Sequence, residues 1–150
     1  MAKFDMKSDT QVAVGLIATL SGTTPSKGNI VDLSGYEAAT FLVCTGTVTD
    51  AGDANGFSFE VQESDTTADV AFTAVANEDL VGLESALTVT SDTADGVAVG
   101  SIGYVGAKRY IRIVATGTTG TNAAVNVVVA KQRPMIGAAT PTYAANIAAT

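Results

Sequence analysis

The sequence predicts an all-β fold, with a single β-sandwich or jelly-roll-like domain and extended arms at both ends. Hydrophobic residues make up 47% of the 150 residues but aromatic residues only 6%, so the apolar side chains are mostly Ala and Val, and Thr and Gly are abundant. This mixture favours pleated strands and turns over helices. Short apolar runs also recur at regular spacing, with Gly, Thr, Asp and Asn between them, which is typical of sandwiches, jelly rolls and barrels.

A chain of this length corresponds to one ordinary domain with one hydrophobic core. Residues 1–10 are polar and mixed in charge, so we expect an N-terminal arm there. We expect the domain to span residues 11–133. Residues 134–150 begin at a proline, which cannot donate to a strand ladder, and form a second arm of small, uncharged side chains. Fully extended, this arm reaches about 55 Å, which is enough to lie across a neighbouring subunit.

The strands expected in the first half of the chain are rich in apolar and β-branched residues and are bounded by turn-forming residues. They span residues 11–20 (interrupted at Gly15), 29–33, 36–44 and 56–62, where 29–33 and 36–44 are either two strands or one bent strand. Between the last two, TGTVTDAGDANG (residues 45–56) consists of small turn-forming residues and predicts a loop tip. Residues 56–62 alternate, with Phe57, Phe59 and Val61 on one face, which predicts a half-buried strand.

In the second half, residues 63–69 predict a polar turn, and residues 69–75 predict a strand that forms a hairpin with residues 56–62. A helical turn is expected within residues 77–83. The remaining strands share the same apolar composition, with Gly, Thr, Asp or Asn between them. They span residues 86–90, 96–105, 109–116 and 122–131.

The net charge of −7 argues against a nucleic-acid binder, because phosphate contacts need a basic surface. The charge is unevenly distributed: all fifteen acids lie in residues 1–95, whereas residues 96–150 hold five bases and no acid. Two interpretations stay open. The acidic and basic parts can pair internally across neighbouring strands, or complementary patches can orient one subunit on another.

An enzyme is not expected from this composition. The chain has no histidine and one cysteine, Cys44, so it lacks the usual general base, the commonest metal ligand and any intrachain disulfide. Cys44 ends an apolar run and is predicted to be a buried small hydrophobe. No GxSxG, Walker or dinucleotide-binding motif occurs. We therefore predict no catalytic residue, no cofactor and no metal site.

The loop around Asp50 and Asp53 is the strongest candidate for a cation site. Aligned as an EF-hand, however, it places Ala51 at the first ligand position and Gln62 at the last. A calcium-binding or hydrolytic site built on Asp50, Asp53 and Glu60 is therefore the least favoured alternative. The other carboxylates stand among Ser and Thr at turn spacing, which predicts solvated charge.

No apolar run approaches the roughly 20 residues that span a bilayer, and residues 1–10 lack the pattern of a secretory signal. We therefore expect a soluble protein that is made in the cytoplasm and has no membrane partner.

The segment GYVGAKRYIRIVAT (residues 103–116) combines bases with tyrosines. As a strand, it directs Ile111 and Ile113 toward the core and Tyr110 and Arg112 toward the outer face. Aromatic and Arg side chains on an exposed face are enriched in protein interfaces. The alternative is pairing with an acidic residue on an adjacent strand. The predicted partner interface comprises Lys108, Tyr110, Arg112, Lys131, Arg133, Pro134 and Tyr143.

Four stretches of the sequence carry a resemblance to a known family: GYEAATFLVCTGTVTDAG, FEVQESDTTADVAFTAVANEDLVG, GYVGAKRYIRIVATGTTG and AVNVVVAKQRP. In this order they resemble small virion proteins encoded in the head-gene region of tailed bacteriophages. The similarity covers about residues 12–134 and leaves both arms outside. Its most distinctive pieces are QESDT (residues 62–66), DLVG (residues 79–82) and GYVGAKRYIRI.

The resemblance implies a capsid decoration or cement protein, which binds the exterior of an HK97-type shell and ties neighbouring capsomers together. The expected partners are then the major capsid protein and further copies of the chain, as a dimer or trimer, and the expected location is the virion exterior. Arms suited to strand addition agree with this role. The alternative is a tail or head-fibre component, or an Ig-like adhesive module.

Overall fold

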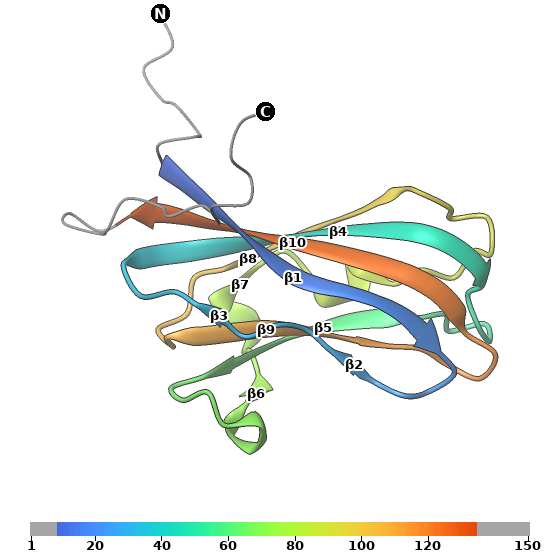
Figure 1. Ribbon diagram of the computed structural model, residues 1–150, viewed down its shortest axis with the longest axis horizontal. Coiled ribbons are helices and arrows are strands. Elements are labelled where there is room, and N and C mark those ends of the chain that lie inside the picture. The colour runs from blue at the N-terminus through green and yellow to red at the C-terminus, as the bar shows by residue number, and fades with distance from the viewer. Residues whose placement is uncertain (1–8, 135–150) are drawn as a thin grey trace, which may run out of the picture.

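The computed structural model describes residues 9–134, which form two antiparallel β-sheets packed face to face (Figure 1). The first sheet has the strand order β1 (Thr10–Ser21), β10 (Asn122–Pro134), β4 (Tyr36–Asp50), β8 (Ala98–Tyr104) and β7 (Leu80–Val81). The second sheet has the order β2 (Ser26–Lys27), β9 (Tyr110–Thr116), β5 (Ser58–Ser64) and β6 (Thr73–Ala74), and β3 (Val31–Asp32) also pairs with β9. The helical elements of this part of the chain are 3-10 turns at Asp69–Ala71, Asn77–Asp79 and Glu84–Leu87. The predicted all-β sandwich is confirmed.

The core lies between the two sheets and is built by side chains that alternate along each strand. Val125, Val127 and Val129 of β10 point inward and are at most 1% exposed. The buried residues on the side of the second sheet include the two isoleucines and the alternating set that were predicted to face inward. They are Ile111, Ile113, Phe57, Phe59 and Val61.

Gly15 marks a bulge in β1. The register with β10 shifts between Val14 and Leu16, so one residue of β1 has no partner. A Cβ atom at Gly15 would lie 2.9 Å from the Cγ2 atom of Val129, which leaves no space for a side chain. The predicted interruption of this strand is therefore a local bulge, and the strand continues beyond it.

The prediction of a loop at residues 45–56 is wrong for residues 45–50, which belong to β4. β4 continues to Asp50, because Thr45 and Val48 pair with β10. Thr and Val favour strands, and the long neighbouring strand β10 supplies hydrogen-bonding partners to this segment. In the opposite sense, the strand expected at residues 29–33 is reduced to the two residues of β3.

Two further predicted strands are largely replaced by 3-10 turns. Of residues 69–75, only β6 pairs with β5, although this pairing confirms the predicted hairpin. Of residues 86–90, only Val89 forms a bridge, to Phe57. The helical turn expected within residues 77–83 is the 3-10 turn Asn77–Asp79.

A side chain covers part of the β5 edge where a strand was expected. The Glu84 carboxylate accepts a 2.6 Å hydrogen bond from the backbone N–H of Val61, and the Val61 carbonyl accepts one from the N–H of Val75. Burial raises the pKa of Glu84 above its usual value. The hydrogen-bonding groups of this strand edge are thus satisfied without a full neighbouring strand.

The first strand begins and the last strand ends at the same end of the sandwich (Figure 1). Thr10 pairs with Gln132, and Tyr36 pairs with Pro134, the proline that was predicted to end the last strand. We call this the terminal end. The predicted arms, residues 1–10 and 134–150 with Tyr143, lie outside the described residues except where they overlap 9–134.

Candidate functional site

Arg112 of β9 is buried, with a side chain only 5% exposed, so the prediction that it stands on an exposed face is wrong. Its Nε donates a 2.9 Å hydrogen bond to Gln62, and a terminal guanidinium nitrogen donates to the Asp69 carboxylate. The guanidinium carbon also lies 4.2 Å from the centroid of the Phe72 ring. The segment from Asp69 to Phe72 covers the outer face of β9 here, and the contacts of Arg112 with Asp69 and Phe72 fix this segment on the sheet.

Four further bases, two of them from the predicted interface (Lys108 and Arg133), also contact acidic residues of the same chain. Lys108 donates to Asp65 at 2.5 Å, and Arg109 donates two hydrogen bonds to Asp32, at 2.8 and 3.0 Å. The hydrogen bond from Arg109 holds the pKa of Asp32 below its usual value, and the hydrogen bond to Asp65 raises the pKa of Lys108. The same arrangement recurs in Lys27 with Asp69 and in Arg133 with Glu37.

These contacts confirm the first interpretation of the uneven charge, because bases from residues 108–133 pair internally with acids from residues 32–69. Within the described range, Lys131 is the basic residue without a carboxylate partner. Its Nζ lies 4.7 Å from the centroid of the Tyr36 ring and donates at 3.3 Å to the carbonyl of Asp32. Burial lowers the pKa of Lys131.

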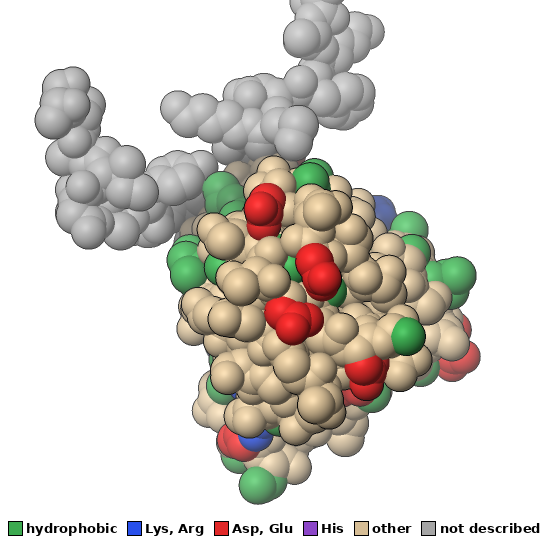
Figure 2. All heavy atoms as spheres, turned by 90° about the vertical axis from the view of Figure 1, so that its right-hand side faces the viewer, with side chains coloured by type: hydrophobic (Ala, Val, Ile, Leu, Met, Phe, Trp, Pro, Cys, Tyr) green, Lys and Arg blue, Asp and Glu red, His purple; other side chains and the backbone are tan. Residues whose placement is uncertain are grey.

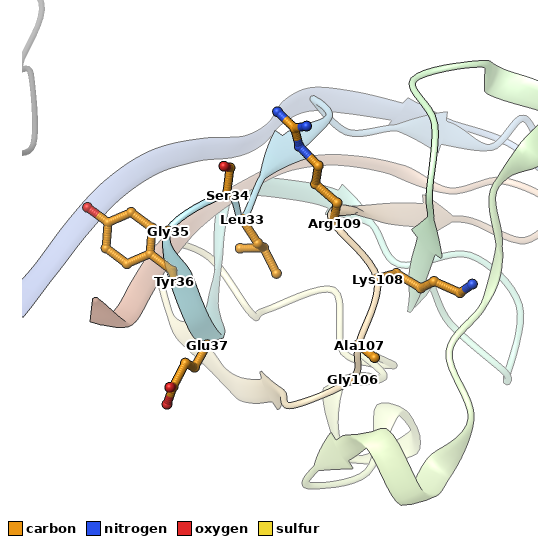
Figure 3. A pocket seen from close by; sticks show the side chains of 9 residues that line it. All are labelled: Leu33, Ser34, Gly35, Tyr36, Glu37, Gly106, Ala107, Lys108 and Arg109. Carbon is orange, nitrogen blue, oxygen red and sulfur yellow. The ribbon is translucent and has the colours of Figure 1, made fainter. Parts of the chain in front are cut away.

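A pocket of about 440 Å³ opens at the terminal end between residues 33–37 and 106–109. Figure 3 shows that the side chains of Lys108 and Arg109 point away from one another and that Glu37 points away from both. Their polar groups therefore do not converge on a common point, which an acid–base or nucleophilic site requires. The pocket is a gap between two loops.

The opposite end of the sandwich is acidic. Figure 2 looks onto this end, and the charged side chains that face the viewer there are mostly acidic. The carboxylates of its loops accept hydrogen bonds from backbone N–H groups nearby. The pairs are Asp50 with Gly52, Asp53 with Asn55, Asp92 with Ala51 and Asp95 with Val48, at 2.6 to 2.8 Å.

These hydrogen bonds fasten the loops, and they use the carboxylates that were considered for calcium. Glu60 lies within β5, where its carboxylate accepts a 2.6 Å hydrogen bond from Gln62. Within residues 9–134, no group of three or more Asp, Glu, Cys or His side chains is arranged to hold a metal ion.

The outer face of the first sheet is uncharged along the length of its strands. β1, β7 and β8 contain no charged residue. β4 is charged only at Glu37 and Asp50, next to or at its ends, and β10 only at Lys131 and Arg133, close to its last residue. The charges of the described residues are thus displaced to the second sheet and to both ends of the sandwich.

On the three strands β1, β10 and β4 of this face, five aliphatic side chains are 39% to 72% exposed, and we call these five the apolar face. They are Val12, Val14, Ile17, Leu42 and Val128. Val14, Val128 and Leu42 stand in one row across β1, β10 and β4, because they are register partners. Exposed aliphatic side chains that are contiguous in this way mark interaction surfaces in soluble proteins.

None of these five residues was predicted as a site residue. The available signal was the absence of alternation in β1 and β10, where apolar residues occupy both faces, as in residues 12–14 and 127–130. That pattern is typical of a strand covered on both sides. The core covers one side only.

Cys44 also lies on this outer face, as the register partner of Asn126. Its side chain is exposed, so the prediction of a buried small hydrophobe is wrong. Successive residues of the apolar run that ends at Cys44 point alternately to the core and to the outer face, and Cys44 is one of those that point outward.

Comparison of the chain with protein-family models, with curated proteins and with solved structures finds no match. Within the described ranges, no helix has the length and apolar character needed to cross a membrane.

Proposed function

We propose that the protein is a non-enzymatic structural protein of a tailed-phage head, which decorates an HK97-type capsid and cements it by bridging major capsid protein subunits. The observation that carries the proposal is the uncharged outer face of the first sheet, on a sandwich whose described bases mostly pair with its own acids. Such a surface suits contact with another protein better than enclosure of a small polar ligand. The sequence resemblance to head-region virion proteins supports the same role. We also propose that the sandwich has a jelly-roll-like topology.

The terminal end is the proposed capsid contact. Lys108 and Arg133 carry exposed charged groups there, with side chains 43% and 74% exposed, and Lys131 and Pro134 lie close to the end of β10. The chain enters β1 and leaves β10 at this same end, so both predicted arms join the domain there; the predicted interface residue Tyr143 belongs to the second arm. Arg112 is excluded from this contact because it is buried.

A decoration assay tests the proposal. Purified protein added to undecorated heads should bind in a fixed ratio to the capsid subunits and raise the temperature at which the heads break open. The Lys108→Glu/Arg133→Glu double variant should bind at least about tenfold more weakly, and wild-type binding should weaken with salt, because exposed charges are screened.

The matched control is Lys27→Glu. Lys27 has a similar exposure, 51%, and a similar ion pair, but lies in β2 of the second sheet. It should bind heads like the wild type. Absence of wild-type binding at every salt concentration would contradict the proposed function, and an equal loss in the control would contradict the terminal end as the contact.

The pocket at the terminal end favours a second candidate, an adhesive module of a tail or head fibre. Ig-like sandwiches carry their binding loops together at one end, and the pocket lies between the loop 106–109 and residues 33–37, which lead into β4. This function predicts binding to a glycan or protein of the host cell surface and no binding to empty shells. The decoration assay therefore separates the two candidates.

A further inference from the structure

We infer that two copies of this chain associate through the outer face of the first sheet, with the apolar face at the centre of the contact. The resemblance implies a dimer or trimer, and the inference assigns a surface to it. It is argued from, and tested on, the isolated protein, so it does not require the proposed function. In a decorated shell, such a dimer would present two terminal ends and so bridge two capsid subunits.

The sheet is large enough for this role. Each residue of a strand covers about 16 Å² of sheet, since strands rise about 3.3 Å per residue and lie about 4.8 Å apart. The strands β1, β10, β4 and β8 have 12, 13, 15 and 7 residues and therefore offer about 750 Å² of outer face. A stable protein interface of standard size buries about 800 Å² on each partner.

The charge distribution favours a second copy on this face over contact through any other face. Each chain carries a net charge of −7, so two copies repel where their carboxylates approach. The described carboxylates belong to the second sheet, the loops and the strand ends. When two copies pack through the outer faces of their first sheets, the described strands therefore bring no carboxylates together at the centre of the contact. A charged partner, in contrast, would find no counter-charge there.

The arrangement of side chains suits a two-fold axis that runs along β10 between two packed copies. This axis sets β1 of one copy above β4 of the other, because both strands are neighbours of β10. Val14 then meets the partner's Leu42, and Val128 meets its own counterpart, since the three are register partners in one row. Such an isologous contact closes after two copies.

One polar contact of this face is compatible with burial. The Thr40 hydroxyl donates a 3.0 Å hydrogen bond to the side-chain oxygen of Gln132, across β4 and β10. This pair is satisfied within the sheet, so covering it leaves no unpaired hydroxyl. Gly103, the register partner of Thr40 on β8, adds no side chain that would hold the copies apart.

Sedimentation velocity of the full chain over a range of concentrations tests the inference. The wild type should reach the mass of two chains, and Val14→Asp, which places a carboxylate at the centre of the apolar face, should remain a single chain. Val70→Asp is the matched control. It carries the same change at a side chain that is 94% exposed, on the turn Asp69–Ala71 outside the first sheet, and should associate like the wild type.

Ile17→Lys, at a side chain 72% exposed, is a second variant that should be monomeric, and circular dichroism checks that each variant is folded. A monomeric wild type at all concentrations, or folded Val14→Asp and Ile17→Lys that both still dimerise, would overturn the inference. A dimer that does not bind heads would contradict the proposed function alone, whereas a monomer that decorates heads would contradict the inference alone.

Cys44 provides a direct readout of coverage, because its exposed thiol lies on the same face. Maleimide labelling of the dimeric wild type should be at least about tenfold slower than labelling of Val14→Asp, since reaction requires access to the sulfur. Deletion of residues 135–150 should leave both the dimer and this protection intact. If Cys44 is instead protected in a monomer and this deletion exposes it, the C-terminal segment occupies the face, and the inference is overturned.

Discussion

The hydroxyl of Tyr104 and the carboxylate of Glu63 lie 2.6 Å apart and join the two sheets, because Tyr104 belongs to β8 of the first sheet and Glu63 to β5 of the second. Tyr104 is fully buried. Its oxygen also accepts a 2.9 Å hydrogen bond from the backbone N–H of Lys108. One phenol group therefore fixes the spacing between the two sheets and also anchors the loop that precedes β9.

Tyr104→Phe should lower the free energy of unfolding by about 1–2 kcal/mol, because it leaves the Glu63 carboxylate and the Lys108 N–H without their partner. Urea denaturation measures this change. Tyr110→Phe is the control, since the described residues offer no hydrogen-bond partner to the half-buried Tyr110 hydroxyl. A control loss as large as that of Tyr104→Phe would contradict the role of the cross-sheet bond.

Alkaline pH should weaken the fold through the same residue. Burial first, and the hydrogen bond to Glu63 second, raise the pKa of Tyr104 above its usual value of 10.0. The folded chain thus holds this proton more tightly than the unfolded chain, so the stability that it contributes is complete below pH 10.0 and falls as the pH rises further. Denaturation at several alkaline pH values should show a smaller decline for Tyr104→Phe, and an equal decline would contradict this assignment.

Arg112→Glu should destabilise the isolated chain by about 3 kcal/mol or more, because it buries a carboxylate beside Asp69 and removes the donor to Gln62. Thermal unfolding measures the loss. Arg109→Glu is the matched control, because the Arg109 side chain is 54% exposed, and an exposed ion pair contributes little. An Arg112→Glu chain that keeps wild-type stability would contradict the structural role of this guanidinium.

Gly56→Ala should be far more damaging than Gly96→Ala, although both glycines have a positive φ, of 65° and 59°. A Cβ at Gly56 would lie 2.0 Å from the carbonyl oxygen of Val89, whereas Gly96 has no atom within 4 Å of that position. We expect a cost of about 1 kcal/mol at Gly96, for the left-handed backbone alone, and about 3 kcal/mol or more at Gly56. Equal costs in urea denaturation would contradict the close approach to Val89.

Several features of the fold could be predicted because they depend on local chemistry. Proline cannot donate to a ladder, which predicts that the last strand reaches no further than Pro134, and the described part of β10 runs to that residue. The alternation around Phe59 and the interruption at Gly15 are visible along a single strand and reappear in the structure as a buried face and a bulge.

The strands lost or lengthened in the structure depend on distant partners. The Glu84 side chain, 23 residues from Val61, covers part of the β5 edge, and pairing with β10 extends β4 to Asp50. Strand propensity within a short stretch of sequence predicts neither the covered β5 edge nor the longer β4, because both depend on segments far apart in the chain.

By itself, the amino-acid sequence determined the all-β class, the inward face of β9 and the separation of acids from bases, since composition and a period of two suffice for these. Only the tertiary structure decided what lies on the outer faces. It buried Arg112 beneath the segment from Asp69 to Phe72 and left Cys44 and the apolar face open. The physical reason is that alternation assigns a side chain to one of two faces, whereas packing of the rest of the chain decides which face is covered.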